Sequence, residues 1–203
     1  KGALKGQLHL KGASAAQAVD LEAELQNGQT GDMKVENLKL KAGISDVKFL
    51  WPENAAVEIT NFRAGESLSL KKMTASVKRS AEEAYKLTLD GVGTSPAPVA
   101  IKGTADLTNL SSVVPTVRNM DFTATFGKSV VKLGGSVDAE NVALHASADQ
   151  FRLNDLPLTF PDALAGARLN ADLSVTGSIV TPVSVAAVTL QGINGGKYKG
   201  LVL

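Results

Sequence analysis

The feature that most constrains this chain is strict alternation of apolar and polar residues in its last third. Residues 142–148 read VALHASA and residues 169–175 read LNADLSV, with an apolar residue at every second position. In an extended chain, side chains at i, i+2 and i+4 share one face. Each stretch is therefore predicted to be a β-strand with one apolar face and one polar face.

A broken connection joins these two strands, and a third strand follows them. Residues 152–167 read RLNDLPLTFPDALAGA, where two prolines and a glycine interrupt a leucine-rich phrase. Such a phrase is too irregular for a strand and too rich in proline for a long helix. A Thr-Gly turn signal and Pro182 then precede a strand that carries Val183, Val185, Val188 and Leu190.

The same pattern begins at the N-terminus and continues through the middle of the chain. Asn27–Gly28 is predicted to form a hairpin turn, and the change of alternation at Asn37 predicts a β-bulge. Residues 47–52, VKFLWP, are predicted to form another strand, and residues 91–98, GVGTSPAP, a long hairpin loop. With about fourteen such strands and few helical periods, the fold class is predicted to be all-β.

Composition excludes several classes of protein. The net charge is +1 with both signs scattered, which argues against a nucleic-acid partner. The absence of cysteine excludes disulfides and thiolate metal sites. No apolar run approaches the roughly 20 residues of a transmembrane helix. Both ends lie inside alternating patterns, so residues 1–203 are predicted to be one continuous segment of a longer protein, without separate domains.

A long sheet with one apolar face must hide that face. It can close as a barrel, pair as a sandwich, coil as a solenoid, or fold along its length into an open trough with an apolar interior. Changes of alternation and glycines inside strands, such as Gly103, Gly134 and Gly177, are what a curved sheet requires.

Signals for catalysis are weak. Residues 126–129, FGKS, end like a phosphate-binding loop, but the first glycine that this motif requires is missing, so a hairpin turn is expected. His9 and His145 alternate with leucines, and neither lies near a GxSxG or HExxH motif. Both are therefore expected on a solvated face. We therefore predict no enzyme activity, no catalytic residue, no metal site and no cofactor.

Residues 144–192 resemble the internal repeat of the TamB family and of related AsmA-like proteins. The shared pattern is an alternating strand, a leucine-proline phrase (FRLNDLPL), the phrase LNADLSVTGSIVTP, and a strand that ends in glycine. Residues 118–139 resemble these repeats more weakly, and residues 1–110 only in style. The characteristic C-terminal region and N-terminal anchor of the family are not recognisable in the chain.

The resemblance implies a fold, a function and partners. The implied fold is a long curved sheet folded along its length into an open trough, a repeating β-groove. The implied function is a non-catalytic periplasmic module of an envelope-spanning protein. Its groove would shield lipid acyl chains during phospholipid transport to the outer membrane, or outer-membrane protein strands during assembly. The implied partner of the full-length chain is an Omp85-type, TamA-like outer-membrane protein, with an inner-membrane anchor outside this segment.

Alternation and resemblance together predict a set of groove-lining residues. They are Leu21, Leu25, Leu38, Leu40, Val57, Ile59, Leu68, Leu70, Tyr85, Leu87, Leu89, Phe122, Phe126, Leu133, Val142, Leu144, Leu169, Leu173, Val175 and Val185. A second interpretation stays open, in which these residues form the closed core of a structural β-solenoid or sandwich segment of a secreted adhesin. A solenoid repeats at a nearly fixed period, and no such period is found.

Overall fold

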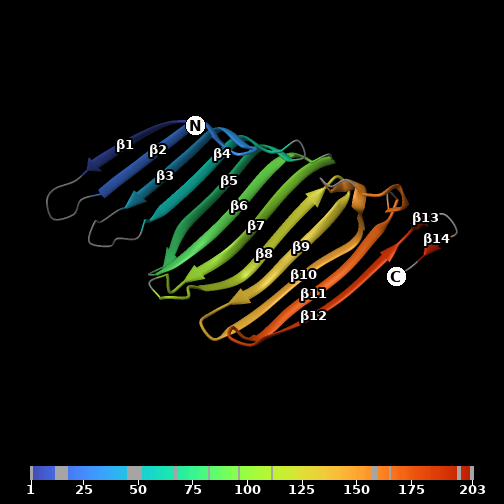
Figure 1. The fold of residues 1–203 in the computed structure, drawn as a ribbon. Helices are drawn as coiled ribbons and strands as arrows, with labels where there is room; N and C mark the ends of the chain where they lie inside the picture. The colour runs from blue at the N-terminus through green and yellow to red at the C-terminus, as the bar shows by residue number, and fades with distance from the viewer. Residues whose placement is uncertain are drawn as a thin grey trace.

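The fold was analysed in a computed structural model of the chain. It describes residues 2–11, 18–44, 52–65, 68–81, 83–95, 97–110, 112–156, 160–164, 166–195 and 198–201. The strand predicted over residues 47–52 lies almost wholly outside the described residues. Figure 1 shows the described part as a row of long strands in sequence order.

Twelve strands form one antiparallel sheet in which each strand pairs with its neighbours in the sequence. The strands are β1 Ala3–Lys11, β2 Ala18–Thr30, β3 Met33–Ile44, β4 Asn54–Ala64, β5 Leu68–Ala81, β6 Ala84–Ser95, β7 Ala97–Thr108, β8 Thr116–Phe126, β9 Ser129–Val137, β10 Asn141–Arg152, β11 Arg168–Ser178 and β12 Pro182–Gln191. Two short strands, β13 Ile193–Gly195 and β14 Tyr198–Leu201, pair only with each other.

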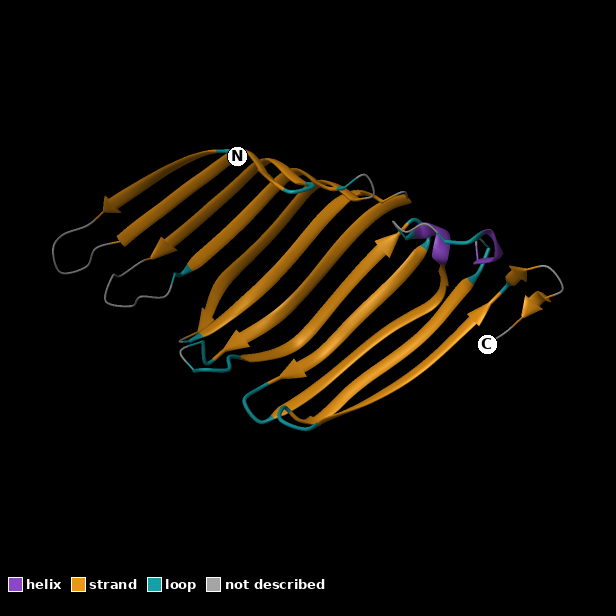
Figure 2. Ribbon diagram, viewed as in Figure 1, coloured by secondary structure: helices purple, strands orange, loops and turns teal. Residues whose placement is uncertain are grey.

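The sheet is open. β1 and β12 are its two edges, and they do not pair with each other. The described helical residues are two single 3₁₀ turns, η1 Leu153–Asp155 and η2 Asp162–Leu164, both in the proline-interrupted connection between β10 and β11 (Figure 2). The prediction of an all-β chain is confirmed, and so is the irregular character of that connection.

Two predicted turns are wrong. Asn27–Gly28 lies inside β2, and the chain reverses at Gly31–Asp32, where Gly31 has a φ of +53°. The long loop expected at residues 91–98 is absent, because β6 continues to Ser95 and pairs there with Ala97 of β7. In both places the ladder continues through residues whose local preference is for a turn.

Several strands contain a residue in the left-handed region of backbone conformation, and there the alternation changes phase. Asn27, Asn61, Asn119 and Gln150 have φ between 48° and 51°. Asn is the non-glycine residue that tolerates this region best. Beside Asn119 and Gln150 the register shifts, and Lys71 of β5 is likewise skipped between paired neighbours. Such irregularities bend a strand and increase its twist.

The predicted change of phase at Asn37 is also found. Val35 pairs with Phe62, and Leu38 pairs with Ile59, so residues three apart on both strands share one face. Leu70 and Met73 have the same spacing on β5. The bend therefore crosses β3, β4 and β5 at one level of the sheet.

A small packed core lies where the β10–β11 connection meets the ends of β7 to β9. Phe151 is 2% exposed, and its ring meets that of Phe126 edge to face with centroids 5.9 Å apart. Val99, which pairs with Phe126, and Leu153 of η1 are also buried. Elsewhere the described elements contact mainly their neighbours in the sheet, which leaves a single layer.

Candidate functional site: the apolar face of the sheet

Cross-strand pairing assigns every paired residue to one face of the sheet, because directly opposite residues point to the same side. One row across the strands holds Leu25, Leu38, Ile59, Met73, Gly91, Ile101, Ala124, Val131, Ala148, Ala171 and Val188. The next row holds Ala23, Leu40, Val57, Ala75, Leu89, Gly103, Phe122, Leu133, Ala146, Leu173 and Ala186. We call this side the apolar face.

The predicted groove-lining residues fall on the apolar face, with one exception. Val185 pairs with Ser174, whereas Val175 on the same hairpin pairs with Ser184. Val185 therefore lies on the opposite face, where it is 64% exposed, and its assignment to the groove lining is wrong. Alternation within β12 was read correctly, but Val183 and Val185 belong to one face while Val188 and Leu190 belong to the other.

Burial varies along the apolar face. Tyr85 and Leu70 are buried, at 3% and 6% exposed, and Val142 is buried as well. Leu133 and Leu173 are exposed, at 37% and 41%. The hydroxyl of Tyr85 is buried without a hydrogen-bond partner in the described structure. Phe126 belongs to the packed core beside Phe151, so it is covered by the chain itself.

A hollow of about 420 Å³ opens in the apolar face near the β2–β3 turn. Of the predicted residues, Leu25, Leu38 and Ile59 line it. Met33, Val35 and Phe62 also line it and were missed. The signal was present in the three-residue spacings Val35–Leu38 and Ile59–Phe62, which place both members of each pair on one face once the strands are aligned.

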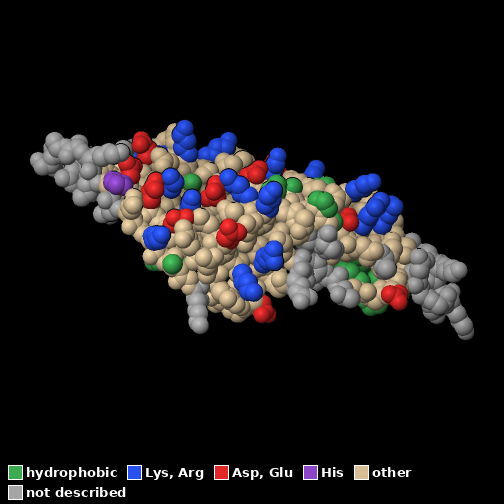
Figure 3. Space-filling model, turned by 90° about the horizontal axis from the view of Figure 1, so that it is seen from above, with side chains coloured by type: hydrophobic (Ala, Val, Ile, Leu, Met, Phe, Trp, Pro, Cys, Tyr) green, Lys and Arg blue, Asp and Glu red, His purple; other side chains and the backbone are tan. Residues whose placement is uncertain are grey.

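The opposite face carries charges in alternating order. Lys5, Glu24, Lys39 and Glu58 stand opposite one another on β1 to β4. We call this side the charged face. Seen from above, acidic and basic side chains are interspersed over the surface (Figure 3). Opposite charges on neighbouring strands favour this register, and like charges would oppose it.

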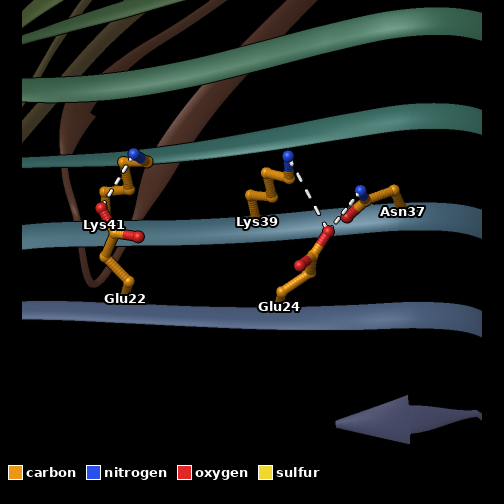
Figure 4. A network of polar contacts seen from close by, with 5 residues as sticks. All are labelled: Glu22, Glu24, Asn37, Lys39 and Lys41. Atoms are coloured by element: carbon orange, nitrogen blue, oxygen red, sulfur yellow. Dashed lines mark hydrogen bonds and ion pairs between the residues drawn. The ribbon is translucent and has the colours of Figure 1, made fainter. Parts of the chain in front are cut away.

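The contacts between β2 and β3 show how this ladder is built (Figure 4). Lys41 Nζ donates to Glu22 Oε1 over 2.9 Å, and Asn37 Nδ2 donates to Glu24 Oε1 over 2.6 Å. The hydrogen bond and charge of Lys41 lower the pKa of Glu22, and Glu22 in turn raises the pKa of Lys41. The Asn37 hydrogen bond is the main cause that lowers the pKa of Glu24.

The side chains that could take part in catalysis are the two histidines and Ser129. His9 and His145 are exposed on the charged face, and His145 Nε2 lies 2.8 Å from Asp172 Oδ2. Ser129, in the sequence that resembles a phosphate loop, begins β9 after a turn at Gly127 and is buried. Among the described residues, no group of three or more His, Asp or Glu is placed to hold a metal ion. No described helix has the length and apolar character needed to cross a membrane.

The fold and its two faces define a class: an open, twelve-stranded antiparallel sheet with one apolar and one charged face. Comparison with known protein families, with curated proteins and with solved structures found no match.

Proposed function

We propose that the chain is a non-catalytic module whose apolar face shields lipid acyl chains. The observation that carries the proposal is an apolar face that spans the twelve strands of one open sheet. An apolar surface of this extent on a soluble chain marks an interaction site. The bends at Asn27, Asn61 and Lys71 favour a sheet that curves into an open trough, with the apolar face as its lining.

The lining suits a chain-like cargo. Burial of an acyl chain gains about 0.8 kcal/mol per methylene, so a sixteen-carbon tail recovers on the order of 12 kcal/mol. The face consists mostly of Leu, Val, Ile and Ala, which offer many similar contacts along a line. A tail held in this way is shielded from water over its length.

The setting of this function rests on the resemblance to TamB-like repeats. We propose that the module belongs to a periplasmic, envelope-spanning protein with an inner-membrane anchor outside this segment and an Omp85-type partner in the outer membrane. Phospholipid on its way to the outer membrane is then the principal cargo. Outer-membrane protein strands are the second candidate, because they too present an apolar face.

A closed sandwich or solenoid core is the alternative to an open trough. A sandwich needs a second sheet packed about 10 Å from the first. The described strands of the large sheet form one layer instead, and this single layer is the observation that favours the trough.

The test is titration with a long-chain fatty acid whose fluorescence rises in an apolar environment. Saturable binding is expected. Leu173→Asp places a carboxylate on the apolar face at a position already 41% exposed, so the fold should survive while affinity falls by about tenfold or more. Leu87→Asp, farther along the same face, should act in the same direction.

Val185→Asp is the matched control. It introduces the same charge on the neighbouring strand, but on the charged face, and should leave binding unchanged. The proposal fails if the wild-type chain shows no saturable binding, or if Val185→Asp weakens binding as much as Leu173→Asp does. Competition by a peptide with alternating apolar residues, in place of phospholipid, would identify protein strands as the cargo.

A further inference from the structure

The hollow near the β2–β3 turn differs from the rest of the apolar face in shape. It is lined mainly by apolar side chains from three strands: Leu25, Met33, Val35, Leu38, Ile59 and Phe62. Its volume of about 420 Å³ lies within the range of sites that hold small organic ligands. The strands bend at this level, because the change of phase brings Val35 and Leu38 to the same side. The hollow is thus a product of the bend.

Gly28 keeps the hollow open. A Cβ atom at this position would lie 2.8 Å from Val35 Cγ1, closer than such atoms approach in proteins, and 3.0 Å from Leu25 Cδ2, which is a tight contact. Gly6 lies on the same face of β1, where the nearest atom to an added Cβ is Glu22 O at 3.7 Å. A side chain at residue 28 would therefore fill the hollow, whereas one at residue 6 would not.

Lys34, at the start of β3, borders the hollow. Lys34 and Arg63 both line a second hollow of about 440 Å³, and both belong to the charged face, because Val35 and Phe62 beside them belong to the apolar face. Lys34 and Arg63 stand directly opposite each other on β3 and β4, a pairing of like charges that destabilises a sheet. Glu36, the nearby carboxylate, accepts a hydrogen bond from Asn61 Nδ2. In the described structure neither Lys34 nor Arg63 forms an ion pair, so a bound anion would relieve their repulsion.

We propose that this hollow is the seat of one alkyl chain of an anionic amphiphile, with the head group held beside Lys34 and Arg63. The inference rests on the proposed function and narrows it to a place and a ligand class. The tail meets apolar side chains on three strands, and the head group passes the strand ends at the β2–β3 turn to reach the two cations on the charged face. Long Lys and Arg side chains reach such a rim while their stems stay on the sheet.

The first experiment compares Gly28→Leu with Gly6→Leu in titrations with a fluorescent sixteen-carbon fatty acid. Both variants add the same side chain to the same face, and circular dichroism checks that each retains its strands. Gly28→Leu should weaken binding by tenfold or more, and Gly6→Leu should leave it within twofold of the wild type. Equal affinity of Gly28→Leu and the wild type would overturn the inference, while the proposed function would stand. Absence of any saturable binding to the wild type would overturn both.

The second experiment tests the charge of the head group. Lys34→Glu with Arg63→Glu should weaken binding of the fatty acid and leave binding of an alkyl trimethylammonium probe of equal length unchanged or stronger. Lys132→Glu, an exposed cation farther along the charged face, is the control and should affect neither probe. Equal loss of both probes in the double variant would overturn the anionic assignment.

Anionic alkyl groups occur as free fatty acids and in phospholipids. Transfer of a labelled phosphatidylglycerol out of vesicles, measured with the wild type and Gly28→Leu, separates the two sources. Transfer that depends on Gly28 assigns the seat to phospholipid. Fatty-acid binding that depends on Gly28, without phospholipid transfer, assigns it to free fatty acid. If Gly28→Leu changes neither fatty-acid binding nor phospholipid transfer, the hollow does not hold the alkyl chain.

Discussion

The ring of Phe122 lies over Gly103 on the neighbouring strand. A Cβ atom on Gly103 would be 1.9 Å from Phe122 Cδ1, so the ring occupies the space that a side chain at residue 103 would need. An aromatic ring that covers a cross-strand glycine in this way protects its backbone and fixes the register. Phe122 therefore lies flat on the apolar face.

Gly103→Ala is expected to destabilise the chain by about 1–3 kcal/mol, because the ring must leave its position. Gly6→Ala, on the same face, should have a much smaller effect, since an added Cβ there meets only ordinary contacts. Urea denaturation followed by circular dichroism measures both. Equal stability of the two variants would contradict the position of the ring.

Ser129 joins the start of β9 to the turn η1. Its hydroxyl donates to Asp155 Oδ2 over 2.6 Å and accepts from the backbone N–H of Arg152 over 2.8 Å. Ser129→Ala removes both bonds at a residue that is 3% exposed, and should lower the free energy of unfolding by about 1–3 kcal/mol. Ser80→Ala, at an exposed position of β5, should change it by less than about 0.5 kcal/mol. A similar free energy of unfolding for the two variants would show that the Ser129 bonds contribute little.

Much of the fold could be predicted from the sequence, because alternation reports the faces of each strand directly. It identified the strands around Leu173 and Leu38, their apolar sides and the change of phase at Asn37. What alternation cannot report is how the phase of one strand relates to that of the next. This relation depends on the length of each turn and on the bulges, and it is why Val185 was assigned to the wrong face.

The turns were less predictable, because Asn and Gly serve two purposes here. Asn27–Gly28 has the composition of a hairpin turn, but Asn27 instead takes its left-handed conformation within β2 and Gly28 leaves room for Val35. The hollow depends on side chains from three strands, so it becomes visible only once their register is known. The sequence shows that each of its lining residues is apolar, but it does not show that they meet at one place.

Asn61 tests the importance of the left-handed residues. Asn61→Val places a β-branched residue at a φ of 50°, and should destabilise the chain by about 1–2 kcal/mol or more, with loss of the hydrogen bond to Glu36. Asn61→Gly keeps the conformation accessible and should be the milder change. Thermal unfolding distinguishes them. A variant with Val that is as stable as the variant with Gly would contradict a role for backbone conformation at this bend.

The charged face predicts how stability depends on pH. Glu22, Glu24 and Glu58 each have a pKa below the ordinary value of 4.5, chiefly because of hydrogen bonds from Lys41, Asn37 and Lys72. A carboxylate whose pKa is lower in the folded chain than in the unfolded chain stabilises the fold above the unfolded pKa. That stabilisation is lost as the pH falls through the folded pKa. Protonation of these three glutamates should therefore decrease the free energy of unfolding as the pH falls below about 4.5.

At alkaline pH the dependence of stability on pH is the opposite for Lys41, whose pKa is raised above 10.5 by Glu22. Its contribution to stability is complete below the unfolded pKa and disappears as the pH rises through the folded pKa.

The test at acid pH is the triple variant Glu22→Gln, Glu24→Gln and Glu58→Gln. Between about pH 7 and pH 3 its free energy of unfolding, measured by urea titration, should fall less than that of the wild type. Added salt should shrink the difference, because these groups are exposed and their pairing is screened. If the three substitutions left the loss of stability at acid pH unchanged, the contacts of the charged face would fix the strand register without contributing to stability.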